Sequence, residues 1–436
     1  MSWLLFVIYT ALLILLVRKW SFFDTPKVGR NVLTAILLAK VACSFAFTYI
    51  YTYYYANNTS DLFNYLADGK VIHDVAFQHP LDFLSIMTGI GASQPHLMQY
   101  YDTCNFWLAS IDFGIPHDTH IVIRANAIIH FISMGNVHIH NLLLGFFAFI
   151  GQWAICKTIH KYLPHAKMLT VLTVFCLPSV IFWTSTAIKE SLLIGFFGLF
   201  IYQFDQLICN AKKLPHMLWL VVLSFMLMQS KFYVLMAALP AFASYAWIKK
   251  VKHGQPITQF VIAHLFLFAL VLIMAKVTSL DFFDIISQKQ HAFINMVEEQ
   301  GNVGSRIDIP LLDGTILSMI CNAPQAFLNT LFRPSVFEVS GLTMLMAAAE
   351  NILLLLLMLM GLSMIKKSNF GRVEVWTWLS FVVILYVLVG LTTPVLGALV
   401  RYKIPALPFI GIVIMLLADE KKLGNVEKKI ARLQTQ

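Results

Sequence analysis

Long apolar segments dominate the sequence and constrain its fold more than any other feature. Eleven of them could cross a bilayer as helices, and most are about 17–24 residues long. They lie near residues 2–17, 32–55, 141–157, 168–185, 190–208, 217–230, 232–248, 257–279, 341–364, 375–393 and 403–418. Only 12% of the residues are charged, whereas a soluble domain carries about 25%. We therefore predict an all-α polytopic membrane protein with about 11 transmembrane helices, and we exclude a soluble globular protein.

The positive charges predict how the chain is oriented in the membrane. Most of the 31 Lys and Arg residues fall in one alternating set of short loops and in the segment 419–436. Short loops of this kind face the cytoplasm, so we predict a cytoplasmic C-terminus and an N-terminus outside. Arg18 and Lys19 follow the first apolar run rather than precede it, which favours a retained span over a cleaved signal peptide.

The chain is predicted to be a single transmembrane domain over residues 1–436 with two long extracytoplasmic loops. The loops cover 56–140 and 280–340, and 419–436 forms a cytoplasmic tail. In the first loop, residues 61–75, 81–90, 95–112 and 119–134 mix apolar and polar positions at helical spacing, as helices at a membrane interface do. The segments 217–230 and 232–248 are short and separated by Lys231, which predicts a helical hairpin that only partly crosses the membrane.

The first outer loop carries the best candidates for an acid–base residue. Asp61, Tyr65 and Asp68 are spaced i, i+4, i+7 and therefore share one helix face. A carboxylate at the membrane surface can take a proton from an incoming hydroxyl. The simpler alternative is a solvated face on which Asp61 caps the helix after Ser60.

Other ionisable and aromatic candidates are predicted at the outer ends of the spans. They are Lys189, Glu190, Lys231, Arg333, Arg401 and Tyr402. Basic groups there suit a substrate with an anionic headgroup on an apolar tail, because Arg binds phosphate through two hydrogen bonds and Lys acts as a point charge. Anchoring of the span ends is the alternative, and it is what we expect of Lys403. Lys40 and Glu350 lie within spans, where a functional role and a helix–helix hydrogen bond are equally open.

The sequence does not require a cofactor. His117 with His120, and His138 with His140, are spaced like metal-ligand pairs, but no cysteine or carboxylate pattern completes a recognised site. A divalent metal ion therefore stays an open option. The absence of a phosphate-binding glycine loop and of an HExxH motif gives no support to ATP-driven transport or zinc proteolysis.

Four segments, taken in chain order, resemble the GT-C class of multi-span membrane glycosyltransferases, in particular bacterial proteins related to dolichyl-phosphate-mannose-type transferases. They are Ser60–Gly69 with its acidic motif, Pro178–Ser191, Leu331–Pro334 followed by Glu338 and Glu350, and Arg401–Pro405 followed by Pro408. The chain departs from the pattern in having a single Asp after Ser60 and Lys231 where an Arg is expected. The base is therefore open between Asp61 and Asp68.

The resemblance implies an inverting glycosyltransferase that acts on the extracytoplasmic face of a bacterial inner membrane, in the cell envelope. The donor would be a polyprenyl-phosphate-linked sugar and the acceptor a hydroxyl of a glycan, lipid or protein, with membrane lipids as neighbours and no nucleic-acid partner. Arg401, with Arg333, Lys231 or Lys189, would hold the phosphate while Asp61 takes the proton.

Two other functions are compatible with the same sequence. A polysaccharide polymerase or ligase would transfer whole undecaprenyl-linked glycans from the same membrane face. A non-enzymatic lipid-glycan flippase or transporter would need polar groups at the bilayer midplane, whereas the charged positions here gather at the predicted outer boundary.

Overall fold

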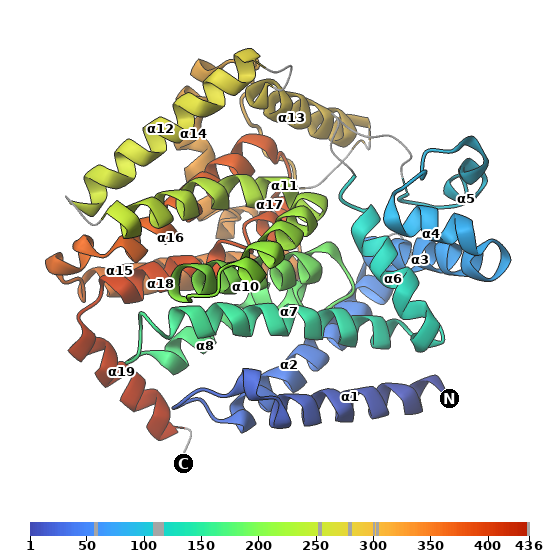
Figure 1. Ribbon diagram of the computed structural model, residues 1–436, viewed down its shortest axis with the longest axis horizontal. Coiled ribbons are helices and arrows are strands. Elements are labelled where there is room, and N and C mark those ends of the chain that lie inside the picture. Colours follow the sequence, from blue (N-terminus) through green and yellow to red (C-terminus); the bar gives the residue numbers. More distant parts are fainter. Residues whose placement is uncertain are drawn as a thin grey trace. The chain divides into compact units, whose positions relative to one another are not determined.

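The computed structural model describes residues 1–55, 60–107, 117–251, 255–277, 281–299, 301 and 305–433. Within these ranges every named element is a helix, and the only β-type pairings are the isolated bridges Arg306–Val395 and Ile365–Ala418. The predicted all-α class is thereby confirmed for the described part of the chain (Figure 1).

Eight of the described helices are long and apolar enough to cross a membrane, and a ninth span results if α17 and α18 count as one. By length and composition the chain is an integral membrane protein. The prediction of eleven spans differs from this count in two places. Residues 168–185 form the short helices α8 (Lys167–Phe175) and α9 (Pro178–Trp183), and residues 217–248 lie within one long helix, α11 (Leu214–Val251).

Helix α11 contains the break that the sequence predicts. Lys231 has φ −154° and ψ 92°, which is extended rather than helical backbone. The hydrogen-bonded ladder of the helix cannot continue through such a residue. The predicted division at Lys231 is confirmed, although its two halves are joined end to end in one bent element.

The chain forms two compact units, which are described separately. Unit 1 comprises Met1–Thr158 and Val180–Phe232, and unit 2 comprises Ile159–Ser179 and Tyr233–Gln436. The main helices of unit 1 are α1 (Ser2–Lys19), α2 (Arg30–Tyr49), α3 (Asp61–Gln78), α4 (Pro80–Thr88), α5 (Met98–Tyr101), α6 (His120–Ser133), α7 (Val137–Ile159) and α10 (Lys189–Cys209). The short 3-10 helices η1 (Ser21–Phe23) and η3 (Pro95–Leu97) lie between longer helices, and the π-helix η2 (Ile50–Tyr54) continues α2.

Glycines allow α7 and α10 of unit 1 to approach each other at backbone distance. A Cβ atom added to Gly198 would lie 2.0 Å from the carbonyl oxygen of Gly151, and one added to Gly151 would lie 2.4 Å from that of Ile194. Small residues at a helix crossing are typical of membrane helix packing. The crossing therefore has no room for a larger side chain at either glycine.

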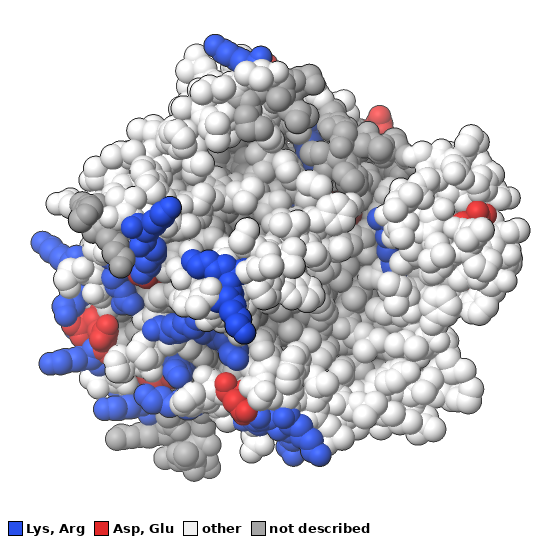
Figure 2. Space-filling model, in the orientation of Figure 1, with Lys and Arg blue, Asp and Glu red and all other residues white. Residues whose placement is uncertain are grey.

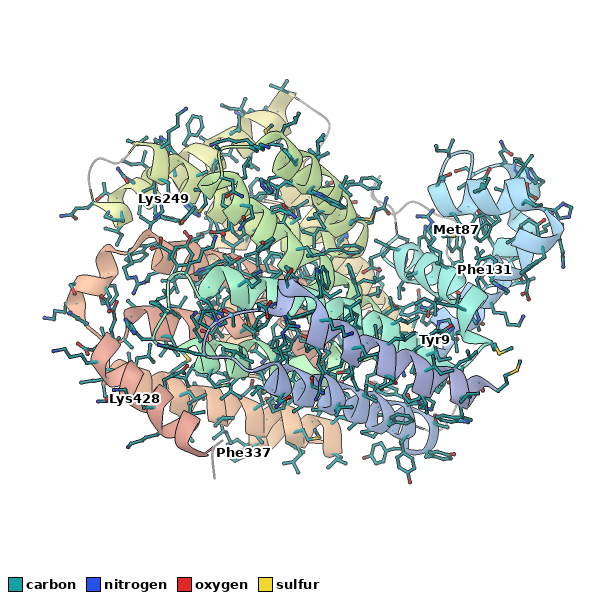
Figure 3. The ribbon with its side chains drawn as sticks, turned by 60° about the horizontal axis from the view of Figure 1, so that its bottom comes forward. Tyr9, Met87, Phe131, Lys249, Phe337 and Lys428 are labelled. Atoms are coloured by element: carbon teal, nitrogen blue, oxygen red, sulfur yellow. The ribbon has the colours of Figure 1, made fainter. Side chains whose placement is uncertain are left out.

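The predicted helices of the first outer loop are present as α3, α4, α5 and α6, which lie together in Figure 1. The predicted helix 95–112 is present only as Pro95–Leu97 and Met98–Tyr101. Residues 102–107 are not helical, and 108–112 lie outside the described residues. Helices α3 and α6 pack closely, because Gly69 leaves room for Asn126. Phe131 of α6, labelled in Figure 3, packs on the ring of His73 at 4.5 Å.

Unit 2 contains α8 and the second half of the chain. Its further helices are α12 (Pro256–Val277), α13 (Phe282–Glu299), α14 (Ile316–Phe332), α15 (Leu342–Leu362), α16 (Val373–Thr392), α17 (Leu396–Tyr402), α18 (Leu407–Leu417) and α19 (Glu420–Leu433), with the turns η4 (Val336–Glu338) and η5 (Lys367–Gly371). Helices α14 and α16 pack closely at Gly390, where an added Cβ would lie 2.0 Å from the carbonyl oxygen of Ala326. A bend of 53° separates α17 from α18.

Candidate functional site

A carboxylate held between two lysines is the most prominent polar cluster of unit 1. Lys189 Nζ lies 2.8 Å from Asp118 Oδ1, and Lys231 Nζ lies 2.6 Å from Asp118 Oδ2. The lysine side chains are only 12% and 6% exposed, whereas that of Asp118 is 30% exposed. The cluster thus presents two largely desolvated ammonium groups around one carboxylate that solvent reaches. We call these three residues the Asp118 cluster.

Each member of the Asp118 cluster sits where regular structure begins or is interrupted. Asp118 lies in the turn before α6, Lys189 is the first residue of α10, and Lys231 occupies the break in α11. The neighbouring Thr119 fixes the turn, since its hydroxyl donates to the Phe106 carbonyl at 3.0 Å. The side chains of the Asp118 cluster thus come from a turn, a helix start and a helix interruption in three segments that are distant in sequence.

The lysines determine the charge state of Asp118. Burial would raise the pKa of this carboxyl, but the ammonium groups of Lys189 and Lys231 outweigh that effect and hold the pKa well below its usual range. Asp118 is therefore a carboxylate at any physiological pH. Such a weakly basic group is better suited to balancing charge than to taking up a proton.

Two further predicted residues lie beside the Asp118 cluster. Lys189 Nζ is 5.8 Å from the centre of the Tyr65 ring, a distance typical of a cation–π contact. Glu190, in the first turn of α10, is buried at 2% exposure. The structure thus brings together Lys189, Lys231 and Tyr65 from the predicted set, with Glu190 adjacent in sequence.

Asp118 itself is absent from the predicted set. It stands in a histidine-containing segment directly before an amphipathic helix, and this context resembles that of a helix-capping residue. The signal that could have identified it is the pair of isolated lysines at span ends, because a buried ammonium group requires an anionic partner.

The predicted face of α3 points into unit 1 rather than into solvent. Tyr65 and Asp68 are buried, whereas Asp61 is half-buried at the first residue of the helix. The solvated-face alternative is therefore wrong for Tyr65 and Asp68. Ser60 occupies the N-cap position, so Asp61 is the first helical residue and not the cap.

Asp68 holds a backbone turn in place. Its two carboxylate oxygens accept hydrogen bonds from the backbone N–H groups of Asn105 and Phe106, each at 2.7 Å. Burial raises the pKa of this carboxyl, and the backbone hydrogen bonds partly offset the increase. Both oxygens of Asp68 are thus engaged in a structural contact with the backbone.

The remaining predicted residues, Arg333, Arg401 and Tyr402, belong to unit 2. Arg333 follows the last residue of α14, and its Nε lies 3.0 Å from Glu338 Oε1. Arg401 and Tyr402 end α17 and are half-buried, and the Tyr402 ring lies 5.9 Å from that of Tyr233. The two arginines are therefore in the other unit from the Asp118 cluster.

The expectation that Lys403 anchors a span end at the lipid surface is wrong. The side chain is 1% exposed. Its Nζ donates to Asn351 Oδ1 at 2.9 Å, to the Arg333 carbonyl at 3.1 Å and to the Thr330 carbonyl at 3.3 Å. These carbonyls lie at the C-terminal end of α14, where the helix leaves them without partners of its own. Lys403 therefore caps α14 from within the protein.

The ionisable residues within spans also satisfy backbone groups. In unit 1, Lys40 Nζ donates to the Thr184 carbonyl at 2.8 Å and to Gln152 Oε1 at 3.1 Å. In unit 2, Glu350 accepts from the Ser179 backbone N–H at 3.0 Å and also from its hydroxyl. Because unpaired backbone groups are costly inside a bilayer, these contacts favour the structural alternative for both residues.

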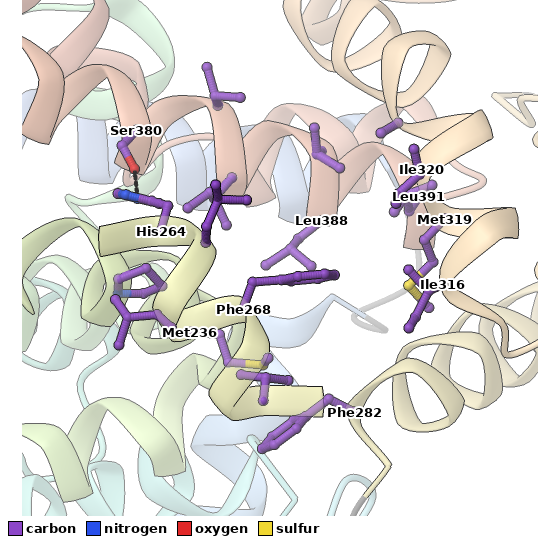
Figure 4. A pocket seen from close by; sticks show the side chains of 18 of the residues that line it. Met236, His264, Phe268, Phe282, Ile316, Met319, Ile320, Ser380, Leu388 and Leu391 are labelled. Atoms are coloured by element: carbon purple, nitrogen blue, oxygen red, sulfur yellow. Dashed lines mark hydrogen bonds between the residues drawn. The ribbon is translucent and has the colours of Figure 1, made fainter. Parts of the chain in front are cut away.

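Unit 2 also contains a large apolar pocket between α12, α13, α14 and α16 (Figure 4). Its volume is about 740 Å³, and its lining includes Phe268, Met319 and Leu388. The polar pair at one end consists of Ser380 and His264, joined by a hydrogen bond of 2.6 Å between Oγ and Nε2. The pocket has the size and chemistry to accept a hydrocarbon chain.

No group of three or more His, Cys, Asp or Glu side chains in the described residues is arranged to hold a metal ion. His138 and His140 of the candidate ligand set lie in α7, where the His140 ring nitrogens bond to Asn126 and Ser133.

In comparisons with known proteins, the chain matches no family model, no curated protein and no solved structure.

Proposed function

We propose that the chain is a membrane-embedded glycosyltransferase that moves a sugar from a polyprenyl-phosphate-linked donor to an acceptor hydroxyl, with inversion at the anomeric carbon. The observation that carries this proposal is the Asp118 cluster beside the predicted face of α3. It combines two poorly solvated ammonium groups with a nearby helix that begins with an acid.

Lys189 and Lys231 bind the phosphate of the donor. When no donor is bound, Asp118 balances the charges of the two lysines and keeps both side chains in position. The phosphodiester of the donor carries one negative charge, as the Asp118 carboxylate does, and competes with it for the same two ammonium groups. Partial desolvation of these ammonium groups strengthens their attraction to an anion. During transfer the two lysines stabilise the charge that grows on the leaving phosphate.

Asp61 serves as the base. It stands one helical turn before Tyr65, on the same face of α3, and Tyr65 lies beside Lys189. Asp61 takes the proton of the acceptor hydroxyl as its oxygen attacks the anomeric carbon. The bond between that carbon and the phosphate oxygen breaks, and polyprenyl phosphate leaves. Base catalysis of this kind contributes roughly 10²–10⁴-fold to the rate.

Taken by itself, unit 2 contains an apolar pocket whose size and lining suit a hydrocarbon chain, and this favours a lipid substrate. Its wall is formed largely by side chains of α12 and α16, which are candidate membrane spans. Arg333 and Arg401 in the same unit are additional phosphate-binding candidates. The proposal includes the orientation derived from the loop charges, with the first outer loop outside and the C-terminus in the cytoplasm of a bacterial inner membrane.

The experiment compares cells that lack the protein with cells restored with the wild type, Asp61→Asn or Lys231→Gln. Mass spectrometry profiles their polyprenyl-phosphate-linked sugars. We expect a lipid-linked monosaccharide to accumulate in the null cells and in both variants, since donor use fails without the base or the phosphate ligand.

The matched controls are Asp74→Asn and Lys212→Gln. Asp74 forms an exposed pair with Lys70, and Lys212 is exposed in the segment before α11. Both controls should restore the wild-type profile. Accumulation of lipid-linked oligosaccharide repeats would instead identify a polymerase or ligase. An unchanged profile in the null cells would contradict transferase activity altogether.

A further inference from the structure

Helix α19 is a basic amphipathic helix that is docked on unit 2 by one face. Leu423 is 6% exposed, and Glu427 and Ile430 are half-buried. These three positions are spaced i, i+4, i+7 and form one stripe. The Glu427 carboxylate accepts hydrogen bonds from the backbone N–H groups of Met168 and Leu169 at the start of α8, at 2.7 and 3.1 Å. The helix is thus fixed to the protein by this stripe, through buried Leu423, half-buried Ile430 and the hydrogen bonds of Glu427.

Four lysines occupy the opposite face of α19. Lys421 and Lys428 are seven residues apart, as are Lys422 and Lys429, so that two pairs run in parallel about 10 Å along the helix axis. All four side chains are exposed. Lys422 Nζ donates to the Ser363 carbonyl at 3.1 Å. In the part of the chain that the structure describes, none of the four forms an ion pair with a carboxylate.

The acids nearest to these lysines have other partners. Asp419 caps α19 by accepting from the backbone N–H groups of Lys421 and Lys422, at 2.9 and 3.2 Å. Glu427 caps α8, as described above. Glu420 lies 4.0 Å from both His165 and Arg372. The Asp419 carboxylate is also attracted to the charges of Lys366 and Lys422, so it offsets part of the positive charge of this surface. Within the described part of the protein, Lys421, Lys428 and Lys429 form no ion pair with a carboxylate.

The lysine face lies just beyond the ends of two apolar helices. Helix α18 ends at Leu417 and α15 ends at Leu362. The segments that follow are joined, since the Lys366 N–H donates to the Leu417 carbonyl at 3.0 Å and the Asp419 N–H to the Met364 carbonyl at 2.8 Å. Lys366 and Lys367 are also exposed and extend the basic surface. Figure 2 shows Lys and Arg side chains gathered around α19, and Figure 3 labels Lys428 on it.

We propose that the lysine face of α19, extended by Lys366 and Lys367, binds the anionic headgroups of membrane phospholipids. Charge complementarity and the position at the ends of apolar helices support this partner, because phospholipid phosphates lie at that level of a bilayer. The stripe of Leu423, Glu427 and Ile430 faces the protein, so the contact of α19 with lipid is made by charge and not by insertion. This surface is independent of the proposed sugar transfer.

The test measures which lipids stay bound to the purified full-length protein. The protein is released from mixed micelles that contain phosphatidylglycerol and phosphatidylcholine in equal amounts. Native mass spectrometry then identifies the lipids that remain bound to it. We expect wild type to retain phosphatidylglycerol preferentially and Lys428→Gln/Lys429→Gln to lose the preference several-fold, since one lysine near an anionic surface contributes about fivefold in affinity. Lys212→Gln/Lys213→Gln is the matched control, because it also removes two adjacent exposed lysines.

Equal retention of the two lipids by wild type overturns the proposal, as does an equal loss in both double variants. Excess inorganic phosphate separates a lipid surface from a simple phosphate site: displacement of phosphatidylglycerol by phosphate alone contradicts recognition of a membrane-bound headgroup. Thermal unfolding of both double variants in neutral detergent verifies that they are folded. Sugar transfer is not part of the readout, so its failure leaves this test unaffected.

Discussion

Lys231 lies at the break of α11 with its Nζ 2.6 Å from Asp118 Oδ2. The backbone irregularity and the ion pair occur at the same residue. Lys231 has extended rather than helical backbone, and its side chain is 6% exposed and paired with Asp118. This relationship links the local structure of α11 to the candidate site.

The first prediction concerns the energetic coupling within the Asp118 cluster. In a double-mutant cycle of Asp118→Asn and Lys231→Met, we expect the two changes to be non-additive by about 1–3 kcal/mol, because the residues are in direct contact. Partial exposure of Asp118 favours the lower end of that range. Thermal unfolding in detergent measures the cycle. Additive losses would mean that the pair contributes nothing as a pair.

The second prediction is a pH dependence of stability caused by Asp118. Burial disfavours its charge, but the lysines outweigh burial and keep the pKa of the folded state below the value of about 3.9 in the unfolded chain. The unfolded state therefore binds more protons as the pH falls below about 5, and the free energy of unfolding decreases. Above that pH the full contribution is present.

Melting temperatures at a series of pH values test this dependence. Between about pH 5 and pH 3, wild type should lose stability more steeply than Asp118→Asn, which lacks the titrating group. Parallel curves for the two proteins would show that Asp118 is not held ionised by the lysines.

The third prediction separates a structural from a catalytic role of Asp68. Asp68→Asn retains only one oxygen for two backbone donors, so a buried N–H group loses its partner at a cost of about 1–3 kcal/mol. Asp74→Asn, at an exposed ion pair, should cost no more than about 1 kcal/mol. Thermal unfolding of the purified variants provides the comparison. An unchanged melting temperature combined with lost sugar transfer would make Asp68 a catalytic residue instead.

The fourth prediction concerns the crossing of α7 and α10. Gly198→Ala places a Cβ where the carbonyl oxygen of Gly151 would be 2.0 Å away, and the helices must separate. Overpacking of this kind costs about 1–3 kcal/mol and sometimes more. Gly397→Ala is the control, since an added Cβ there meets no atom within 4 Å. Similar melting temperatures for both variants would contradict the close approach.

The fifth prediction concerns Lys403. Lys403→Met removes the donor to two backbone carbonyls and to Asn351, and each buried acceptor left unpaired costs about 1–3 kcal/mol. Lys276→Met, at an exposed position near the end of α12, should be nearly neutral. Unfolding curves of the two variants decide the matter. Equal stability would restore the interpretation of Lys403 as a surface anchor.

The all-α membrane class, most span positions and the break at Lys231 could be predicted from the sequence alone, because long apolar runs and their interruptions are local properties of the chain. It also identified Lys189, Lys231 and Tyr65 as residues of interest from their places at span ends and on one helix face. The number of spans was overestimated, because apolar length alone does not show that residues 168–185 divide into α8 and α9 or that residues 217–248 lie within α11.

The contacts of those side chains could not be predicted from the sequence, because they depend on how distant segments pack. Asp118 became part of the site because packing brings the turn before α6 to the start of α10 and to the break in α11. Asp68, Lys40, Glu350 and Lys403 proved to bond to backbone groups of segments distant in sequence. The spacing of residues along the sequence does not predict such pairings, because a buried charge is stabilised by whichever distant group the fold places beside it.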